Sequence, residues 1–106
     1  MLKVLSLMKR KDGQSYEAFR NWALNEHPKL ATKITGMRGY RMNVPVKENP
    51  ELPYDCISEM WWDSDEARLA GFGTPEGKAA GADAAAHADR VHFLAEEKLF
   101  IPEPRG

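Results

Sequence analysis

The chain has 106 residues, which is enough for one small domain built around a single hydrophobic core. Charged residues make up 29% and hydrophobic residues 42% of the sequence, as in an ordinary globular protein. The 15 basic and 16 acidic residues nearly cancel, whereas a protein that binds nucleic acid or an anionic membrane would carry a basic surplus. We therefore expect residues 1–106 to form one domain with neither kind of partner.

The cysteine content and the N-terminus bear on localisation. Cys56 is the only cysteine, so no internal disulfide can form, which fits a reducing compartment. The apolar residues 1–8 are too few for a secretory signal and lead directly into the basic residues 9–11. No apolar run approaches the length that spans a membrane. The sequence thus predicts a cytoplasmic protein.

Hydrophobic periodicity and turn residues divide the chain into six elements. Ser15, Ser64 and Thr74 are typical N-cap residues, and Pro75 suits the first position of a helix. Pro28 lies inside a helical pattern, so that helix should kink or restart there before Gly36 ends it. The expected elements are a strand at 2–8, a helix between 15 and 36, strands at 37–46 and 54–62, helical pieces at 65–72 and from 75 through the alanine-rich 79–88, and a last strand within 91–101.

This βαββαβ order predicts an α+β protein with the ferredoxin-like arrangement, in which both helices cover one face of a four-stranded antiparallel sheet. Residues 4–8 are apolar on both sides of the first strand. The third strand places Cys56, Ser58, Met60 and Trp62 on one side, with Ile57, Glu59 and Trp61 on the other. The uncovered face would therefore stay apolar, so we expect a homodimer that joins two copies through their sheet faces.

His27 stands out because it falls within the apolar stripe of the first helix. Phe19, Ala23, His27, Leu30 and Ile34 are separated by steps of four and three, which is one face of a helix. A buried imidazole needs a hydrogen-bond partner or a cavity. His27 is therefore either a core histidine bonded to a backbone carbonyl or a cavity residue that moves protons near neutral pH.

Each of the other candidate site residues also has a purely structural interpretation. Trp22 and Trp61 could line an aromatic pocket, although tryptophans in a small domain commonly belong to the core or an interface. Glu59 could bind substrate, or it could form a structural ion pair with a lysine or arginine inside its apolar strand. Cys56 has no neighbouring base in the sequence, so we interpret it as a small buried hydrophobic residue.

Metal and cofactor sites are not predicted. The three histidines, His27, His87 and His92, show no spacing that is typical of a zinc site. Nothing in their spacing supports axial ligation of haem. The segment Gly71-Phe72-Gly73 breaks a helix just before a proline and does not resemble a phosphate-binding loop.

The order of several short segments resembles the EthD-like family of dimeric α/β-barrel proteins along nearly the whole chain. The most specific segment runs from the first helix to the second strand. The matching segments are SYEAF (15–19), Trp22, HPKLA (27–31), ITGMRGY (34–40), YDCISEMWW (54–62), DEA (65–67), TPEG (74–77) and AEE (95–97).

The resemblance implies a ferredoxin-like subunit that dimerises through its sheet and holds a pocket between sheet and helices. Relatives include a lactone methylisomerase and fungal decarboxylases and cyclase-like enzymes that act on aromatic polyketides without metal or organic cofactor. In the isomerase-like relatives, a histidine at the position of His27 and a tyrosine at the position of Tyr40 belong to the site. His27 would then move a proton, and the Tyr40 phenol could donate a hydrogen bond to a developing oxyanion. Alternatively, Tyr40 packs under the first helix with its hydroxyl at the rim.

Two functions remain open at this level. The first is a cofactor-free acid/base enzyme that acts on an apolar lactone, aromatic or polyketide-like molecule. The second is a non-catalytic binding or accessory protein that uses the same pocket. An enzyme needs polar groups that converge in the pocket, whereas a carrier can rely on aromatic walls and one anchoring hydrogen bond. A pocket filled by the protein's own side chains is a third possibility.

Overall fold

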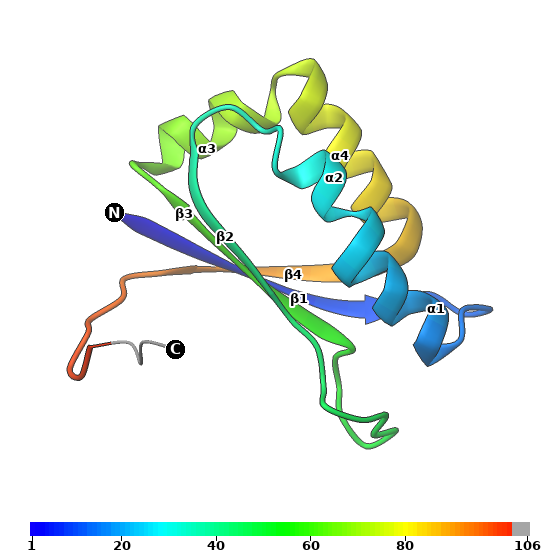
Figure 1. Cartoon of the computed structure of the whole chain (residues 1–106). Coiled ribbons are helices and arrows are strands. Elements are labelled where there is room, and N and C mark those ends of the chain that lie inside the picture. Colours follow the sequence, from blue (N-terminus) through cyan, green and yellow to red (C-terminus); the bar gives the residue numbers. More distant parts are fainter. Residues whose placement is uncertain (103–106) are drawn as a thin grey trace.

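The computed structural model describes residues 1–102 and confirms the predicted order of strands and helices (Figure 1). Within that range one antiparallel sheet contains β1 (Leu2–Arg10), β2 (Met37–Asn43), β3 (Cys56–Trp62) and β4 (Ala88–Ala95), in the order β2-β3-β1-β4. The helical segments are α1 (Tyr16–Asn21), the π-helix η1 (Trp22–Glu26), α2 (Pro28–Ala31), α3 (Asp65–Phe72) and α4 (Pro75–His87). This is the ferredoxin-like α+β fold.

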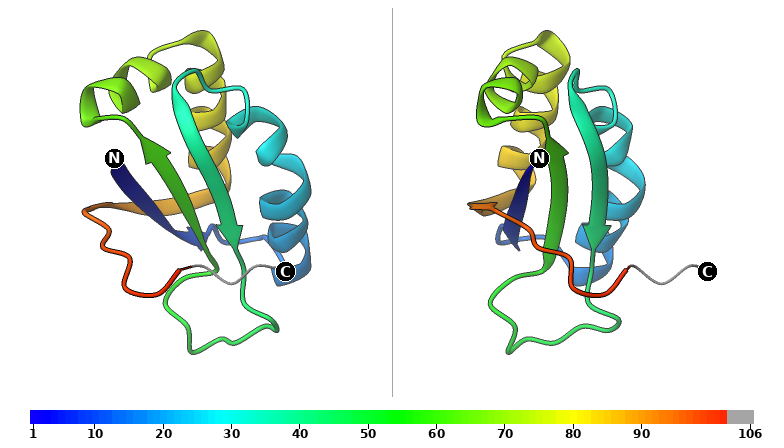
Figure 2. Two further views of the ribbon diagram at one scale, coloured as in Figure 1. Left: turned by 60° about the vertical axis from the view of Figure 1, so that its left-hand side comes forward. Right: turned by 90° about the vertical axis from the view of Figure 1, so that its left-hand side faces the viewer.

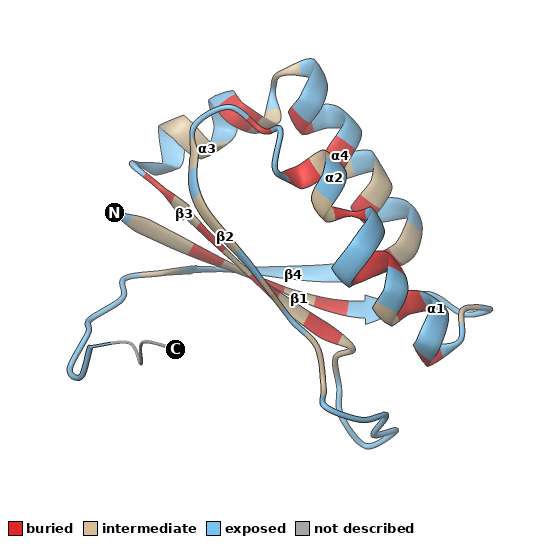
Figure 3. Cartoon of the chain, in the orientation of Figure 1, coloured by how far each residue is buried: buried red, intermediate tan, exposed pale blue. Residues whose placement is uncertain are grey.

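All the helical segments lie on one face of the sheet, and the other face carries none in the described part of the chain (Figures 1 and 2). Alternate residues of β3 are buried against the helices, as the sequence pattern predicted (Figure 3). Two clusters of buried side chains make up the core. One surrounds Phe19 and Met8, and the other surrounds Val4 and Trp62.

The segments α1, η1 and α2 form one continuous helical stretch whose winding changes before Pro28. The His27 N–H donates to the carbonyl of Trp22 at 2.8 Å, which is the i→i−5 bond of a π-helix. Proline has no N–H, so α2 restarts with Pro28 at its first position, as expected. Single π turns often occur at functional sites, and this one orients His27. The predicted apolar stripe is confirmed, since Phe19, Ala23 and Ile34 are buried.

The three predicted N-caps are also confirmed. The side-chain oxygens of Ser15, Ser64 and Thr74 each accept a backbone N–H three residues further along, at 3.1 Å. A cap of this kind stabilises a helix by about 1 kcal/mol.

The strand boundaries differ from the prediction in four places, the first being that β1 continues to Arg10 and does not end at residue 8. β4 begins at Ala88 and not near Val91, because Ala88 already has extended backbone angles directly after α4. β2 ends at Asn43 and β3 begins at Cys56, so the loop between them spans residues 44–55 and is longer than expected. The proline-rich composition of that loop removes the backbone donors that a longer ladder would need.

Candidate functional site

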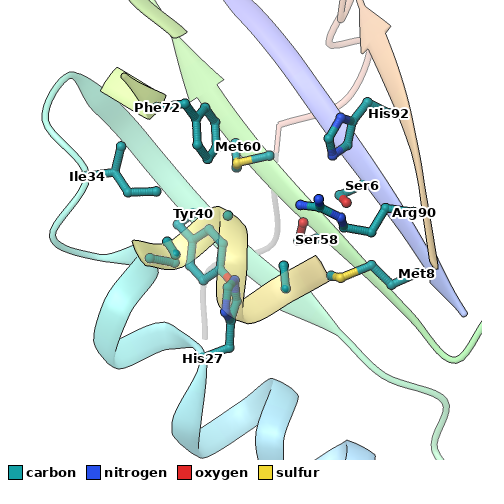
Figure 4. A pocket seen from close by; sticks show the side chains of 14 residues that line it. Ser6, Met8, His27, Ile34, Tyr40, Ser58, Met60, Phe72, Arg90 and His92 are labelled. Atoms are coloured by element: carbon teal, nitrogen blue, oxygen red, sulfur yellow. The ribbon is translucent and has the colours of Figure 1, made fainter. Parts of the chain in front are cut away.

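A cavity of about 30 Å³ lies between the sheet and the helices (Figure 4). Its apolar wall comes from both layers and includes Met8, Ile34, Met60 and Phe72. Its polar lining consists of His27, Tyr40, Ser6, Ser58, Arg90 and His92. A space of this size holds a few water molecules or one small apolar group. The arrangement of its polar groups decides what chemistry it can support.

His27 lines the cavity and contacts the side chain of Asp83 in α4. Nδ1 of His27 lies 2.9 Å from Oδ2 of Asp83. The carboxylate can only accept, so Nδ1 carries the proton and Nε2 keeps a free lone pair in the neutral ring. His27 lines the cavity, whereas Asp83 lies behind it outside the lining. The pair thus presents an imidazole with one nitrogen bonded to a carboxylate and the other nitrogen without a proton.

Trp22 holds the Asp83 carboxylate in place. Its Nε1–H donates to the same Oδ2 atom at 3.0 Å, so this oxygen receives hydrogen bonds from two rings. The indole also stacks on His87, with ring centres 4.4 Å apart and planes inclined by 14°. His87 in turn bonds the backbone carbonyl of Asp83 through Nδ1 at 2.8 Å. The position of the carboxylate is therefore fixed from two sides.

Tyr40 reaches the same cavity from β2, and Figure 4 shows its ring between that strand and the helices. Its hydroxyl is buried and has no hydrogen-bond partner among the described residues. Burial raises the pKa of Tyr40 well above its usual range, so the phenol stays protonated at neutral pH. A buried, unpaired O–H is available to donate to a ligand oxygen.

Two serines form the polar floor of the cavity. Ser6 of β1 and Ser58 of β3 lie opposite each other in the ladder and are 4% and 3% exposed. On the other side of β1, His92 of β4 pairs with Ser6, and Arg90 pairs with Met8. Burial and the nearby guanidinium groups of Arg90 and Arg68 lower the pKa of His92, so its ring is neutral at pH 7.

The structure brings together two of the five predicted site residues, His27 and Tyr40. Trp22 is buried behind His27 and does not line the cavity, so it contacts Asp83 and not a bound molecule. Glu59 and Trp61 lie on the opposite face of the sheet, because their positions alternate with the buried Ser58 and Met60. The prediction that these two residues share a pocket with His27 does not agree with the strand register.

Glu59 instead forms the ion pair that was the alternative interpretation. Its carboxylate lies 2.7 Å from Nζ of Lys3 and accepts from the Asn43 amide at 2.9 Å. The Lys3 hydrogen bond lowers the pKa of Glu59, with a smaller contribution from Asn43. The Lys3 ammonium and the Arg41 guanidinium both approach the ring of Trp61, at 4.9 and 5.1 Å.

Five side chains at or behind the cavity were not predicted as site residues from the sequence. Asp83 is the only charged residue among the alanines and glycine of residues 79–86, which is the signal that could have identified it. A lone carboxylate on a helix that packs against the protein needs a hydrogen-bond donor on the facing element. The other four, Ser6, Ser58, Arg90 and His92, lie on three strands, and only the ladder register brings them together.

Other kinds of site have no support in the described residues. No group of three or more metal-ligating side chains comes together within residues 1–102. Burial raises the pKa of the Cys56 thiol to about 12, so it is a poor nucleophile. None of the helices in this part of the chain has the length and apolar character needed to cross a membrane.

The fold and the cavity define a class of protein: a ferredoxin-like α+β subunit with polar groups converging between the sheet and its helices. The family model of the EthD domain matches residues 11–91, and the chain therefore belongs to the EthD domain family. The resemblance seen in the sequence is thus confirmed. No curated protein matches the chain.

Solved structures support the same assignment. An ethyl tert-butyl ether d (EthD) family protein from Bacillus halodurans is 29% identical, with a TM-score of 0.77 over 92% of this chain and 99% of that one. A dimeric protein of ferredoxin-like fold from Bacteroides fragilis is 20% identical, with a TM-score of 0.68 over 91% and 95%. SnoaB, a cofactor-independent oxygenase from Streptomyces nogalater, is 10% identical, with a TM-score of 0.66 over 96% and 97%. The last two are similar in fold alone.

Proposed function

We propose that the protein is an acid/base enzyme of the isomerase, cyclase or decarboxylase type that acts on a small apolar carbonyl, lactone or aromatic compound. The observation that carries this proposal is the 2.9 Å contact between Nδ1 of His27 and Oδ2 of Asp83 beside a cavity that His27 lines. A histidine held in this way has one fixed tautomer and a free Nε2 atom. Proton transfer by such a group contributes roughly two to four orders of magnitude in rate.

In an isomerisation, the reaction moves one proton within the substrate. Nε2 of His27 takes the proton from an acidic C–H group, whose bonding electrons move onto the neighbouring carbonyl oxygen, or from an O–H group, whose electrons stay on its own oxygen. Asp83 stabilises the imidazolium that forms, and the Tyr40 O–H donates to the oxyanion. The imidazolium then returns the proton at another atom of the substrate, so that His27 is neutral again. No redox partner is needed for this step.

The comparisons are consistent with this chemistry. SnoaB is described as a cofactor-independent oxygenase, and it shares the fold with this chain. Relatives in the EthD-like family include enzymes that act on lactones and aromatic polyketides. We infer that the present protein also works with its own side chains on a compound of this kind.

A proton-exchange assay tests the proposal without knowledge of the natural substrate. A panel of lactones and aromatic ketones with acidic C–H groups is incubated in D₂O, and deuterium uptake is followed by NMR. We expect exchange to be accelerated by the protein and lost, by about two to four orders of magnitude, in His27→Gln. Binding of a compound without exchange by the wild type would favour the binding or accessory function instead.

We also propose that two copies associate through the face of the sheet that carries no helices, which we call the outer face. It presents Leu5 and Leu7 of β1, Ile57 of β3, and Val91 and Phe93 of β4. Val91 and Phe93 are 50% and 57% exposed in the single chain. An apolar face of this kind typically marks an interface. The Bacteroides fragilis protein and a ferredoxin-like protein from Thermobifida fusca are both described as dimeric.

A further inference from the structure

One side of the cavity is formed by β4, which is one of the two edge strands of the sheet. Arg90 and His92 line the cavity, yet both are exposed residues. They are two positions apart on a strand, so they share the face toward the helices. In Figure 4 both side chains extend from β4 on the side of the cavity away from His27. They therefore make up its mouth.

Arg90 has no acidic partner within residues 1–102, in contrast to three other arginines of the chain. Arg10, Arg38 and Arg68 each approach a carboxylate, at 3.3, 3.5 and 2.7 Å. The acidic neighbour of Arg90 in the sequence, Asp89, lies on the other side of the strand and pairs with Lys11 at 3.7 Å. The guanidinium at the mouth is thus a cation to which residues 1–102 supply no counter-charge.

Four further side chains make this a built site and not a single surface charge. The hydroxyls of Ser6 and Ser58 are buried in the floor of the cavity, and Ser6 neighbours His92 across the β1–β4 ladder. Arg90 and Arg68 both act on the His92 ring, which places positive potential at the mouth. The buried Tyr40 hydroxyl, without a partner among the described residues, lies deeper in the same cavity.

We propose that the mouth of the cavity binds the carboxylate of an anionic substrate, with Arg90 as its counter-ion and His92 and Ser6 as hydrogen-bond partners. The planar guanidinium presents two parallel N–H groups that match the two oxygens of a carboxylate. This deepens the proposed function, on which it rests, by naming the substrate class as small apolar carboxylic acids, such as an aromatic acid or a carboxylated lactone.

The size and polarity of the cavity agree with this orientation. Its volume of about 30 Å³ admits one small apolar group beside Met60 and Phe72. A carboxylate placed that deep would have to lose its water, which is costly, whereas at the exposed mouth it stays partly hydrated. The apolar end would then point inward toward His27, where the proton is moved.

Ligand pairs that differ only in charge test the proposal. Benzoate and benzamide, and the smaller isobutyrate and isobutyramide, are titrated while the imidazole signals of His27 and His92 are followed by NMR. The wild type should bind each carboxylate about tenfold or more tightly than its amide, and Arg90→Gln should remove most of that preference. Arg38→Gln, which removes a charge outside the cavity, should keep it.

Other outcomes would overturn the proposal. These are equal binding of acid and amide, no binding of either carboxylate, an unchanged preference in Arg90→Gln, or stronger competition by inorganic phosphate than by benzoate. His27→Gln separates this site from the proposed reaction. It should lose proton exchange and keep the preference for carboxylates, so a failure of one proposal is distinguishable from a failure of the other.

Discussion

His27 and Asp83 are joined by a 2.9 Å contact although 56 positions separate them in the chain. His27 follows the π turn η1, between α1 and α2, and Asp83 lies in α4. The pair therefore links two helical segments on the same face of the sheet as well as setting the tautomer of the histidine. Substitutions that alter the His27 tautomer without unfolding the protein can therefore separate the structural role of the pair from its proposed role in proton transfer.

The first prediction concerns the tautomer of His27. Asp83→Asn keeps the size of the side chain but replaces an obligate acceptor with an amide that can also donate. We expect the His27 ring to change from one tautomer, protonated at Nδ1, to a mixture, as measured by ¹⁵N chemical shifts. Proton exchange should fall with it. Asp89→Asn, which alters an exposed aspartate paired with Lys11, is the control and should leave the His27 shifts unchanged.

The second prediction uses the unpaired hydroxyl of Tyr40. A buried O–H without a partner costs stability, so Tyr40→Phe should raise the free energy of unfolding by about 1 kcal/mol while lowering proton exchange. Tyr16 is the matched control, because its hydroxyl donates to the carbonyl of Pro45 at 2.8 Å. Tyr16→Phe should lower the free energy of unfolding by about 1 kcal/mol. A loss of stability in Tyr40→Phe as large as that in Tyr16→Phe would contradict the assignment.

The fold was predictable because it depends on local signals. Period-two alternation in 54–62 assigned Ser58 and Met60 to one face and Glu59 and Trp61 to the other. The capping residues Ser15 and Ser64 marked where helices begin. These patterns arise from the geometry of a single strand or helix and need no knowledge of its neighbours.

The site was less predictable because it depends on contacts between distant elements. Asp83 sits in an alanine-rich helix whose composition does not show which face meets η1. Arg90 was placed outside the last strand, since Ala88 enters β4 with no loop after α4. Glu59 and Trp61 became candidates by residue type, although the alternation of their strand separated them from Trp62. Which face of the sheet borders the cavity depends on how the helices pack against the sheet.

The third prediction follows from the lowered pKa of Glu59. Lys3 stabilises the ionised form in the folded state, so the folded pKa lies below the unfolded value near 4.5. The ion pair therefore contributes stability above that pH and loses it as the pH falls through the folded pKa. Urea unfolding at a series of pH values should show a steeper loss below about pH 5 for the wild type than for Glu59→Gln. Parallel curves would mean that the pair contributes nothing.

The fourth prediction tests the outer face. Light scattering at micromolar concentration should report about twice the 12.0 kDa chain mass. Phe93→Asp places a charge among the apolar side chains of that face and should give a monomer, because an unpaired buried carboxylate is strongly unfavourable. Leu94→Asp is the matched control, since Leu94 is next on the same strand and 46% exposed but faces the helices, opposite Val4. It should remain a dimer. A monomeric wild type would contradict the proposed dimer. A dimer that survives Phe93→Asp would mean that the interface lies on another surface.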